Sequence, residues 1–322
     1  MVEARRLLAE PAPAGFPLGL HAFCKLNLGL AVGPRRPDGF HEVATVFQTI
    51  DLADTLYARP RARGLRLRVV RRGPARGRGL AVGAGGSNLV ARAARRLRAA
   101  AGERGGAEIL LVKRVPAGSG LGGGSSDAAA ALRLLARLWG APVRTEGLRR
   151  LAGGLGSDCA FFVAGGRARA TGRGERLRRL RVPGPRRVLV ALPATGVPTA
   201  RAYRLLDEAR GAAARAKSLT PSARARKISP RWTHPTMSLG ARSLLRNDFE
   251  EVIASHYPGI RAATSLLCEL GVGSPRLSGS GSAVFLELQP GVAAPGAVTR
   301  QRQRSLALVL ARFTRVGSLW CR

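Results

Sequence analysis

A glycine-rich stretch over residues 116–124, followed by Ser125, Ser126 and Asp127, is the part of the sequence best suited to chemistry. Its five glycines would each lose conformational entropy in a regular helix or strand, so the stretch predicts a loop. The alanines and leucines that continue to Leu138 predict a helix, and the two serines and the aspartate are typical N-cap residues. Glycines that let a ligand approach the backbone, next to the free N–H groups of a helix start, favour an anion such as phosphate.

The loop does not match the common phosphate-binding signatures. No Gly-Lys-Ser/Thr follows the glycines, as a Walker A loop requires. The acidic residue that a dinucleotide-binding fingerprint places about 20 residues downstream is absent, and so is the Asp-Phe-Gly of protein kinases. Two interpretations remain, an ordinary surface loop and a phosphate-binding loop of another kind.

Lys25 is the first charged candidate for chemistry, because it stands inside the apolar strand pattern of Leu20 to Val32. Asn27 follows two residues later and so lies on the same face of the strand. A surface lysine on an edge strand is the alternative. However, Lys25 is one of only four lysines in a chain with 54 basic residues, which favours a role that arginine cannot fill.

Asp158 is the second charged candidate. It follows the turn Gly-Leu-Gly-Ser at 154–157 and precedes an apolar run, so we expect it at the rim of the core. One interpretation is a helix cap. The other is a general base, which must reach a substrate hydroxyl and would be kept ionised by a nearby lysine.

The net charge of +35 makes nucleic acid or an acidic membrane surface a partner to consider. Nearly all basic residues are arginines spread over the whole chain, and aromatic residues make up only 5%. This pattern argues against a stacking surface for nucleic acid. We therefore expect non-specific affinity for polyanions and no specific nucleic-acid partner.

Other features narrow the location and the cofactors. No apolar run is long enough to cross a membrane, and the first 17 residues lack the apolar core of a secretory signal. The four cysteines and four histidines are scattered, which argues against disulfides and against a metal site made by the protein. The sequence predicts a cytoplasmic protein that does not bind membranes.

With 322 residues, the chain is long enough for two domains with separate cores. We expect a flexible tail at 1–19, a first domain at 20–180 and a second at 181–322. The boundary is placed in the polar, basic stretch 173–185. Residues 212–241 are basic, contain three prolines and show little periodicity, so they are expected to form a flexible insertion.

The expected elements give an α+β fold. In the first half, strands are predicted at 43–51, 65–72 and 107–113, and helices at 145–152 and up to Ala101, the latter capped by Ser87. In the second half, a strand at 188–193 precedes helices at 199–209, 244–256 and 259–270. A glycine-rich turn at 274–285 then lies between two short strands, and a last helix and strand follow. This order is typical of a ferredoxin-like domain.

Three motifs in this order resemble the GHMP small-molecule kinases. Two further segments resemble those members that act on a cytidine diphosphate-linked methylerythritol in the non-mevalonate isoprenoid pathway. The resemblance covers residues 20–285. It rests on the loop 116–126, the Gly-Ser-Asp of 156–158 and residues 277–285, and on Lys-Leu-Asn-Leu at 25–28 with Arg-Pro-Asp-Gly-Phe-His-Glu at 36–42.

The resemblance implies a GHMP kinase fold, with a ribosomal-protein-S5-like N-terminal domain and a ferredoxin-like C-terminal domain. It implies transfer of the ATP γ-phosphate to the 2-hydroxyl of that substrate, with Asp158 as base and Lys25 as its partner. Mg²⁺ would arrive with ATP rather than in a protein metal site, and the enzyme would be a monomer or homodimer. The residues implied at the nucleotide are Asn88, Lys113, Pro116, Ala117, Gly118, Ser119, Gly120, Leu121, Gly122, Gly123, Gly124, Ser125 and Ser126.

At the substrate, the resemblance implies a cytosine held between Phe40 and Tyr203, with His41 at its edge and Asn27 positioning the substrate. A kinase for homoserine or a sugar would not need such aromatic residues. A basic RNA-binding protein on a related fold is the alternative from a different class. The chain departs from the family pattern at Phe23-Cys24 and Cys159-Ala160, where Pro-Ala and Val-Pro are usual, and in the start of the loop.

Overall fold

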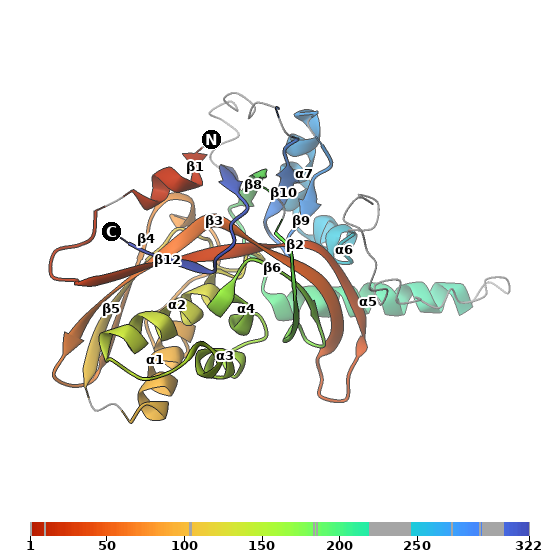
Figure 1. The fold of residues 1–322 in the computed structure, drawn as a ribbon. Helices are drawn as coiled ribbons and strands as arrows, with labels where there is room; N and C mark the ends of the chain where they lie inside the picture. Colours follow the sequence, from red (N-terminus) through yellow and green to blue (C-terminus); the bar gives the residue numbers. More distant parts are fainter. Residues whose placement is uncertain are drawn as a thin grey trace.

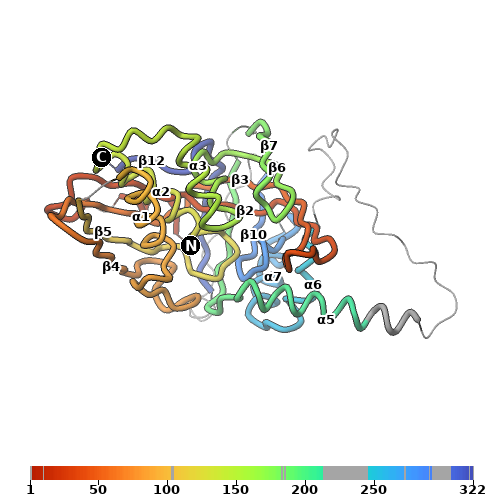
Figure 2. Tube along the Cα trace, turned by 90° about the horizontal axis from the view of Figure 1, so that it is seen from below, coloured from red at the N-terminus to blue at the C-terminus, as the bar shows by residue number. Residues whose placement is uncertain are grey.

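The computed structural model describes residues 2–9, 11–102, 105–182, 184, 186–218, 246–271, 273–289, 291 and 306–321. These residues form two β-sheets, each covered by its own group of helices (Figure 1). Seen from below, helices α1–α3 lie towards one end of the molecule and α5–α7 towards the other (Figure 2).

The first sheet has seven strands, and β2 and β3 form its long central hairpin. Four helices pack on it around a core of small and aliphatic side chains, to which the alanines of α2 contribute. Its strands are β2 (Leu18–Arg35), β3 (His41–Arg61), β4 (Leu65–Arg71), β5 (Gly106–Lys113), β6 (Arg167–Thr171), β7 (Arg176–Leu180) and β12 (Ser318–Trp320). Its helices are α1 (Leu89–Ala100), α2 (Gly123–Leu138), α3 (Thr145–Gly153) and α4 (Cys159–Ala164).

The second sheet has five strands in the order β1-β11-β8-β10-β9. The last four pair with one another in antiparallel fashion, and β1 pairs with β11 in parallel. They are β1 (Val2–Glu3), β8 (Arg187–Pro193), β9 (Arg276–Leu277), β10 (Val284–Glu287) and β11 (Leu306–Arg312). Helices α5 (Thr199–Ser218), α6 (Glu250–His256) and α7 (Pro258–Glu269) contribute to the core on one face. Strand β8 is buried on both faces, because Leu189 and Ala191 face these helices while Val188, Val190 and Leu192 pack towards the first sheet.

The expected α+β class is confirmed, but several local expectations are wrong. Helix α2 begins at Gly123 with Gly122 as its N-cap, so Ser125–Asp127 lie inside its first turns. Helix α1 is capped by the Asn88 side chain, which accepts a hydrogen bond from the Val90 N–H, and not by Ser87.

The helix expected at 244–256 is present only from Glu250. The Asn247 side chain accepts a hydrogen bond from the Phe249 N–H, and the Asp248 side chain accepts one from the Val32 N–H. Such bonds between side chains and the backbone compete with helix formation. Helix α5 extends to Ser218, into the segment 212–241 that was expected to be flexible, and the rest of that segment lies outside the described residues. The predicted last helix also lies outside them, between β10 and β11.

The two ends of the described chain exchange sheets, which differs from the expected flexible tail at 1–19. Strand β1 pairs in parallel with β11 of the second sheet, and the following turn of 3-10 helix (Ala4–Leu8) places Arg5 3.1 Å from Asp51 of β3. Near the other end, β12 pairs with β2 of the first sheet. Each sheet therefore contains a strand from the opposite part of the chain.

A buried histidine on β2 gives the stability a specific pH dependence. His21 is 9% exposed, and its pKa is lowered to about 4 by burial and by the charge of Arg114. The unfolded chain binds a proton at about pH 6.5, so the free energy of unfolding should fall by about 1.4 kcal/mol per pH unit between there and about pH 4. Urea unfolding at several pH values should show this slope, and His21→Gln should remove that share of it. An identical slope in the variant would contradict the assignment.

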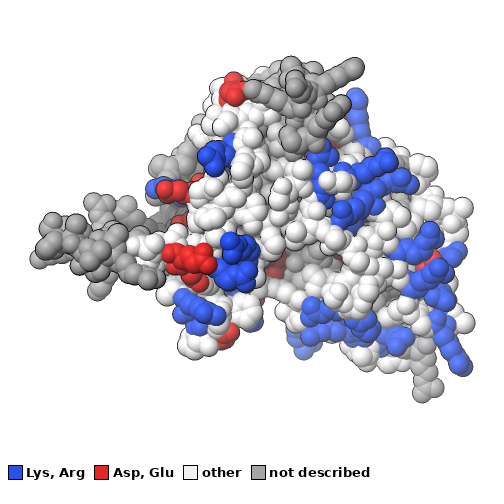
Figure 3. Space-filling model, turned by 180° about the vertical axis from the view of Figure 1, so that it is seen from behind, with Lys and Arg blue, Asp and Glu red and all other residues white. Residues whose placement is uncertain are grey.

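No helix in the described part of the chain is both long and apolar enough to cross a membrane. On the face shown in Figure 3, Lys and Arg form several separate patches rather than one continuous band.

Candidate active site

The glycine-rich loop between β5 and α2 is fixed from two sides. The Leu121 carbonyl accepts a hydrogen bond from the Lys25 N–H of β2 (2.9 Å). The Gly118 and Ser119 carbonyls accept from the N–H groups of Ser282 (3.2 Å) and Ala283 (2.9 Å) in the turn between β9 and β10. The two glycine-rich segments singled out in the sequence are therefore in direct contact.

Two glycines of the loop cannot be replaced without displacing neighbours. Gly120 has φ +76°, and a Cβ there would lie 2.0 Å from the Ser278 carbonyl oxygen. Gly122 has φ +71°, and a Cβ there would lie 2.8 Å from the Phe162 ring. Positive φ and close backbone contact both require glycine, so these residues set the path of the chain into α2.

Lys25 and Asp158 lie together beneath this loop. Lys25 Nζ is 3.6 Å from Asp158 Oδ2, donates to the Gly120 carbonyl (3.0 Å) and to Asn27 Oδ1, and lies 5.1 Å from the centre of the Phe47 ring. The lysine side chain is 4% exposed and that of Asp158 29%. Burial lowers the pKa of Lys25, and the charge of Asp158 partly offsets this. The pair thus joins a buried cation to a carboxylate that solvent or a ligand can reach.

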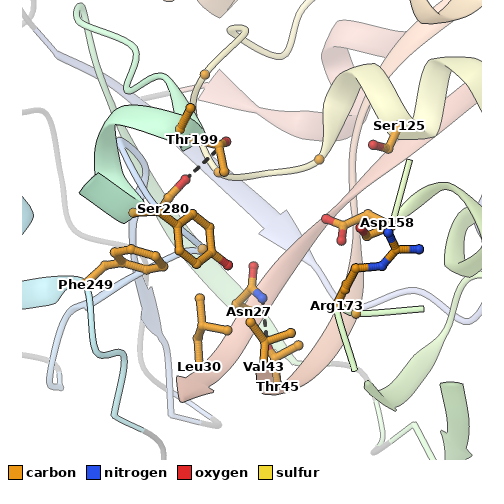
Figure 4. A pocket seen from close by; sticks show the side chains of 18 of the residues that line it. Asn27, Leu30, Val43, Thr45, Ser125, Asp158, Arg173, Thr199, Phe249 and Ser280 are labelled. Carbon is orange, nitrogen blue, oxygen red and sulfur yellow. Dashed lines mark hydrogen bonds between the residues drawn. The ribbon is translucent and has the colours of Figure 1, made fainter. Parts of the chain in front are cut away.

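The pair opens into a cavity of 930 Å³ between the glycine-rich loop, the β2–β3 hairpin and α5. Asp158, Arg173 and Ser125 lie on one side of it, and Phe249, Thr199 and Ser280 on the other (Figure 4). A cavity of this size accommodates two small ligands or one large ligand.

Most of the loop residues expected at the nucleotide line this cavity, namely Pro116, Ala117, Gly118, Ser119, Gly120, Gly122, Gly123, Gly124 and Ser125. Leu121 and Ser126 do not. The Leu121 side chain is buried in the core between the sheets, and Ser126 Oγ donates to the Phe23 carbonyl (2.6 Å).

Asn88 and Lys113 line a smaller pocket of 230 Å³ that adjoins the cavity at Gly124. The Asn88 side chain caps α1 and donates to the Gly83 carbonyl (2.7 Å). Lys113 Nζ is bonded to Asp54 and to Asp127 (2.8 Å), in a cluster that is fully buried. Burial alone would lower the pKa of Lys113, but Asp127 and Asp54 together raise it.

The four residues expected at the substrate also line the cavity, with contacts of their own. His41 stacks on Tyr203, with ring centroids 5.0 Å apart and planes at 25°, and its Nε2 is 3.3 Å from Asp207. Phe40 is 52% exposed. Asn27 accepts from Lys25 and donates to Thr45 Oγ1 (2.8 Å).

Sequence reasoning missed two residues of this region. Asn247 is buried and donates to the carbonyls of Leu277 (2.9 Å) and Gly279 (2.7 Å). Since its own backbone forms a bridge with Leu30, it ties the β9–β10 turn to β2. Arg173 enters the cavity beside Asp158 (Figure 4). The sequence offered a signal only for Arg173, which lies between two glycines where a turn is expected.

The chain is similar to known proteins over most of its length. Residues 88–166 match the GHMP kinases N terminal domain. A 4-diphosphocytidyl-2-C-methyl-D-erythritol kinase of Xanthomonas oryzae pv. oryzae is 39% identical over 91% of this chain and 86% of its own length. A similarly named kinase of Bordetella bronchiseptica is 42% identical over 86% of this chain and 81% of its own length.

A crystal structure of 4-(cytidine 5'-diphospho)-2C-methyl-D-erythritol kinase superposes with a TM-score of 0.65 at 32% identity, covering 92% of this chain and 98% of that one. The loop, the turn at 156–158 and the β9–β10 turn therefore occur together within an overall similarity that spans nearly the whole chain. The chain belongs to the 4-diphosphocytidyl-2-C-methyl-D-erythritol kinase family of GHMP kinases.

Proposed function

We propose that this enzyme transfers the γ-phosphate of ATP to the 2-hydroxyl of 4-diphosphocytidyl-2-C-methyl-D-erythritol. The observation that carries the proposal is the ion pair of Lys25 and Asp158, which opens into the cavity beneath the glycine-rich loop. The family relationship supplies the identity of the substrate and the use of ATP. Such a kinase acts where ATP is available, and we place it in the cytoplasm.

Asp158 acts as the general base in this mechanism. It takes the proton of the substrate hydroxyl as the hydroxyl oxygen forms its bond to the γ-phosphorus and the bond to the β-phosphate oxygen breaks. Lys25, 3.6 Å away, stabilises the negative charge that develops on the attacking oxygen.

The loop holds the phosphates of ATP. The first residues of α2, Gly123–Ser125, line the cavity. The first N–H groups of a helix have no intrahelical partners, and the helix dipole favours negative charge there. Because phosphoryl transfer depends mostly on position and charge, a rigid loop is suited to it. Gly120 and Gly122 contribute to this rigidity, because each packs so closely against its neighbours that there is no room for a side chain.

The oxygen donors of the cavity fit Mg²⁺ that is held mainly by phosphates and water. Ser125 lies beside Asp158 at the start of α2 (Figure 4), and its hydroxyl would be a protein ligand. Among the described residues, no group of three or more His, Cys, Asp or Glu side chains could form a protein cage for the ion. When bound, Mg²⁺ neutralises charge on the transferring phosphoryl group.

The rings at the far side of the cavity bind the cytosine. Phe40 offers an exposed ring, and Tyr203 is supported by an edge-on contact with Phe249, with centroids 5.0 Å apart. His41 and Asn27 supply polar groups near them. Since His41 covers one face of the Tyr203 ring, cytosine must either stack on the opposite face of that ring or displace the imidazole.

The direct test is ATP consumption by the purified enzyme with the cytidine diphosphate-linked substrate, with homoserine and galactose as controls, in salt that suppresses polyanion binding. We expect turnover with the cytidine compound alone. Turnover with only a control alcohol would contradict the substrate. Salt-sensitive RNA binding that survives Asp158→Asn, without any ATP turnover, would favour the RNA-binding alternative.

Replacing Phe40 with Ala should raise KM for the cytidine substrate by about 10- to 100-fold, because a stacked base contributes about 1–3 kcal/mol. The kcat and the KM for ATP should stay within about twofold, since the side chain lies away from the reacting atoms. Val316→Ala is a matched control, as it shortens an exposed apolar residue outside the cavity. An unchanged KM in Phe40→Ala would argue against the cytosine contact.

A further inference from the structure

Arg173 has a position that the proposed mechanism does not use. It lies at the turn between β6 and β7, lines the cavity, and its guanidinium carbon is 4.9 Å from the centre of the Phe40 ring. Its neighbour Gly174 is so close to the base that a Cβ there would lie 3.5 Å from Asp158 Oδ1. Arg173 therefore lies between the aromatic end of the cavity and the reacting end.

The turn that carries Arg173 is held firmly against β3. The Gly172 N–H donates to Glu42 Oε1 (3.0 Å), and the Gly172 carbonyl accepts from the Val43 N–H (2.7 Å). The Arg173 N–H itself donates to Glu175 Oε2 (2.6 Å). These contacts involve backbone atoms of the turn, so the position of the arginine is fixed while its guanidinium stays available.

The carboxylates around the cavity are engaged with other groups and not with that guanidinium. Asp38 acts on Arg173 electrostatically from beyond ion-pair distance, and its own ion pair is with Arg36 (3.2 Å). The two carboxylates that line the cavity already have cationic or imidazole neighbours, Asp158 beside Lys25 and Asp207 beside His41. Throughout the described ranges, no carboxylate forms an ion pair with Arg173. A planar, unpaired guanidinium that faces a cavity matches the paired oxygens of a phosphate group.

We propose that Arg173 binds the diphosphate that links cytidine to the methylerythritol, and so selects for a diphosphate-containing substrate. This inference rests on the proposed function, which places the cytosine at Phe40 and the acceptor hydroxyl at Asp158. The diphosphate joins these two ends of the substrate, and Arg173 lies between the residues that bind them. By stacking on Phe40, the guanidinium is also held in the orientation in which it meets the phosphate oxygens.

The test compares the binding of cytidine diphosphate and of cytidine by calorimetry, with the ATP site filled by a non-hydrolysable ATP analogue. In Arg173→Gln, we expect the Kd of cytidine diphosphate to rise by about 10- to 100-fold, because hydrogen bonds between ionised groups are lost. The Kd of cytidine should change by less than about twofold, since it lacks the phosphates. Arg179→Gln on β7 is the matched control and should change neither value, because its exposed side chain lies outside the cavity.

The other outcomes overturn the inference in distinguishable ways. Equal loss for both ligands would mean that Arg173 supports the Phe40 ring and does not bind phosphate. A higher Kd for the ATP analogue in Arg173→Gln, with cytidine diphosphate unaffected, would assign the arginine to the phosphates of ATP. Wild-type enzyme that fails to phosphorylate the cytidine substrate would refute the proposed function itself. An active wild type with an unchanged ratio of the two Kd values in the variant would refute only the role of Arg173.

Discussion

Replacing Asp158 with Asn should reduce kcat by about 10²- to 10⁴-fold, the usual contribution of a positioned general base. The amide is nearly the same size as the carboxylate but cannot accept the hydroxyl proton. Loss of the Asp158 carboxylate also removes the ion pair with the buried Lys25 ammonium, 3.6 Å away. The Kd for ATP should stay within about twofold, because in the proposed mechanism the phosphates bind to the glycine-rich loop and not to Asp158.

Single-turnover kinetics and ATP titration on the same preparation would check this result. Glu146→Gln on α3 is a suitable control, since it makes the same change from carboxylate to amide at an exposed residue outside the cavity, and its kcat should remain close to that of the wild type. Full activity in Asp158→Asn would contradict the assigned base. A loss of ATP affinity as large as the loss of kcat would instead indicate that the variant disturbs the loop.

Replacing Lys113 with Met should lower the free energy of unfolding by about 3–5 kcal/mol, because it leaves two buried carboxylates without their cation. Asp54 and Asp127 are 0% and 2% exposed, and both bond to the Lys113 ammonium. Burial already raises the pKa of Asp127, and loss of Lys113 would raise it further. Asp54 also accepts from the Val115 N–H (2.8 Å), so the cluster fixes the start of the glycine-rich loop.

Urea unfolding at neutral pH would measure this loss, and adding Asp127→Asn to the Lys113→Met variant should recover part of it. Arg149→Met is the control, because it removes an exposed ion pair with Glu146 that contributes little. If Lys113→Met were as stable as the wild type, the buried cluster would not contribute to stability. In that case the contacts of the loop with β2 and with the β9–β10 turn would be enough to hold it.

Features that depend on near neighbours in the sequence could be predicted. The alternation of side chains along a strand put Lys25 and Asn27 on one face, and their side chains are hydrogen-bonded there. The glycine-rich stretch at 274–285 was expected to be a turn between two short strands, and β9 and β10 pair around it. In both cases the chemistry of a few adjacent residues decides the conformation.

Features that depend on distant partners could not be predicted in the same way. Asn247 reads as part of a helix, but its side chain bonds to the β9–β10 turn, 30 residues away along the chain. Lys113 is a second example. It stands at the end of β5, and nothing near it in the sequence indicates that it pairs with Asp54, which lies 59 residues earlier. Only the folded chain brings such groups into contact, and burial then makes their pairing necessary.

The exchange of β1 and β12 between the sheets means that neither half of this enzyme is a continuous piece of polypeptide. Any single cut between the two sheets would leave each with a strand on the wrong fragment. The chain crosses between the sheets near both ends of its described part as well as between β7 and β8, so their separation is constrained at several points. The glycine-rich loop and Asp158 lie on the side of one sheet and the β9–β10 turn on the side of the other, and all three line the same cavity. These crossings therefore limit how far the two walls of the cavity can separate.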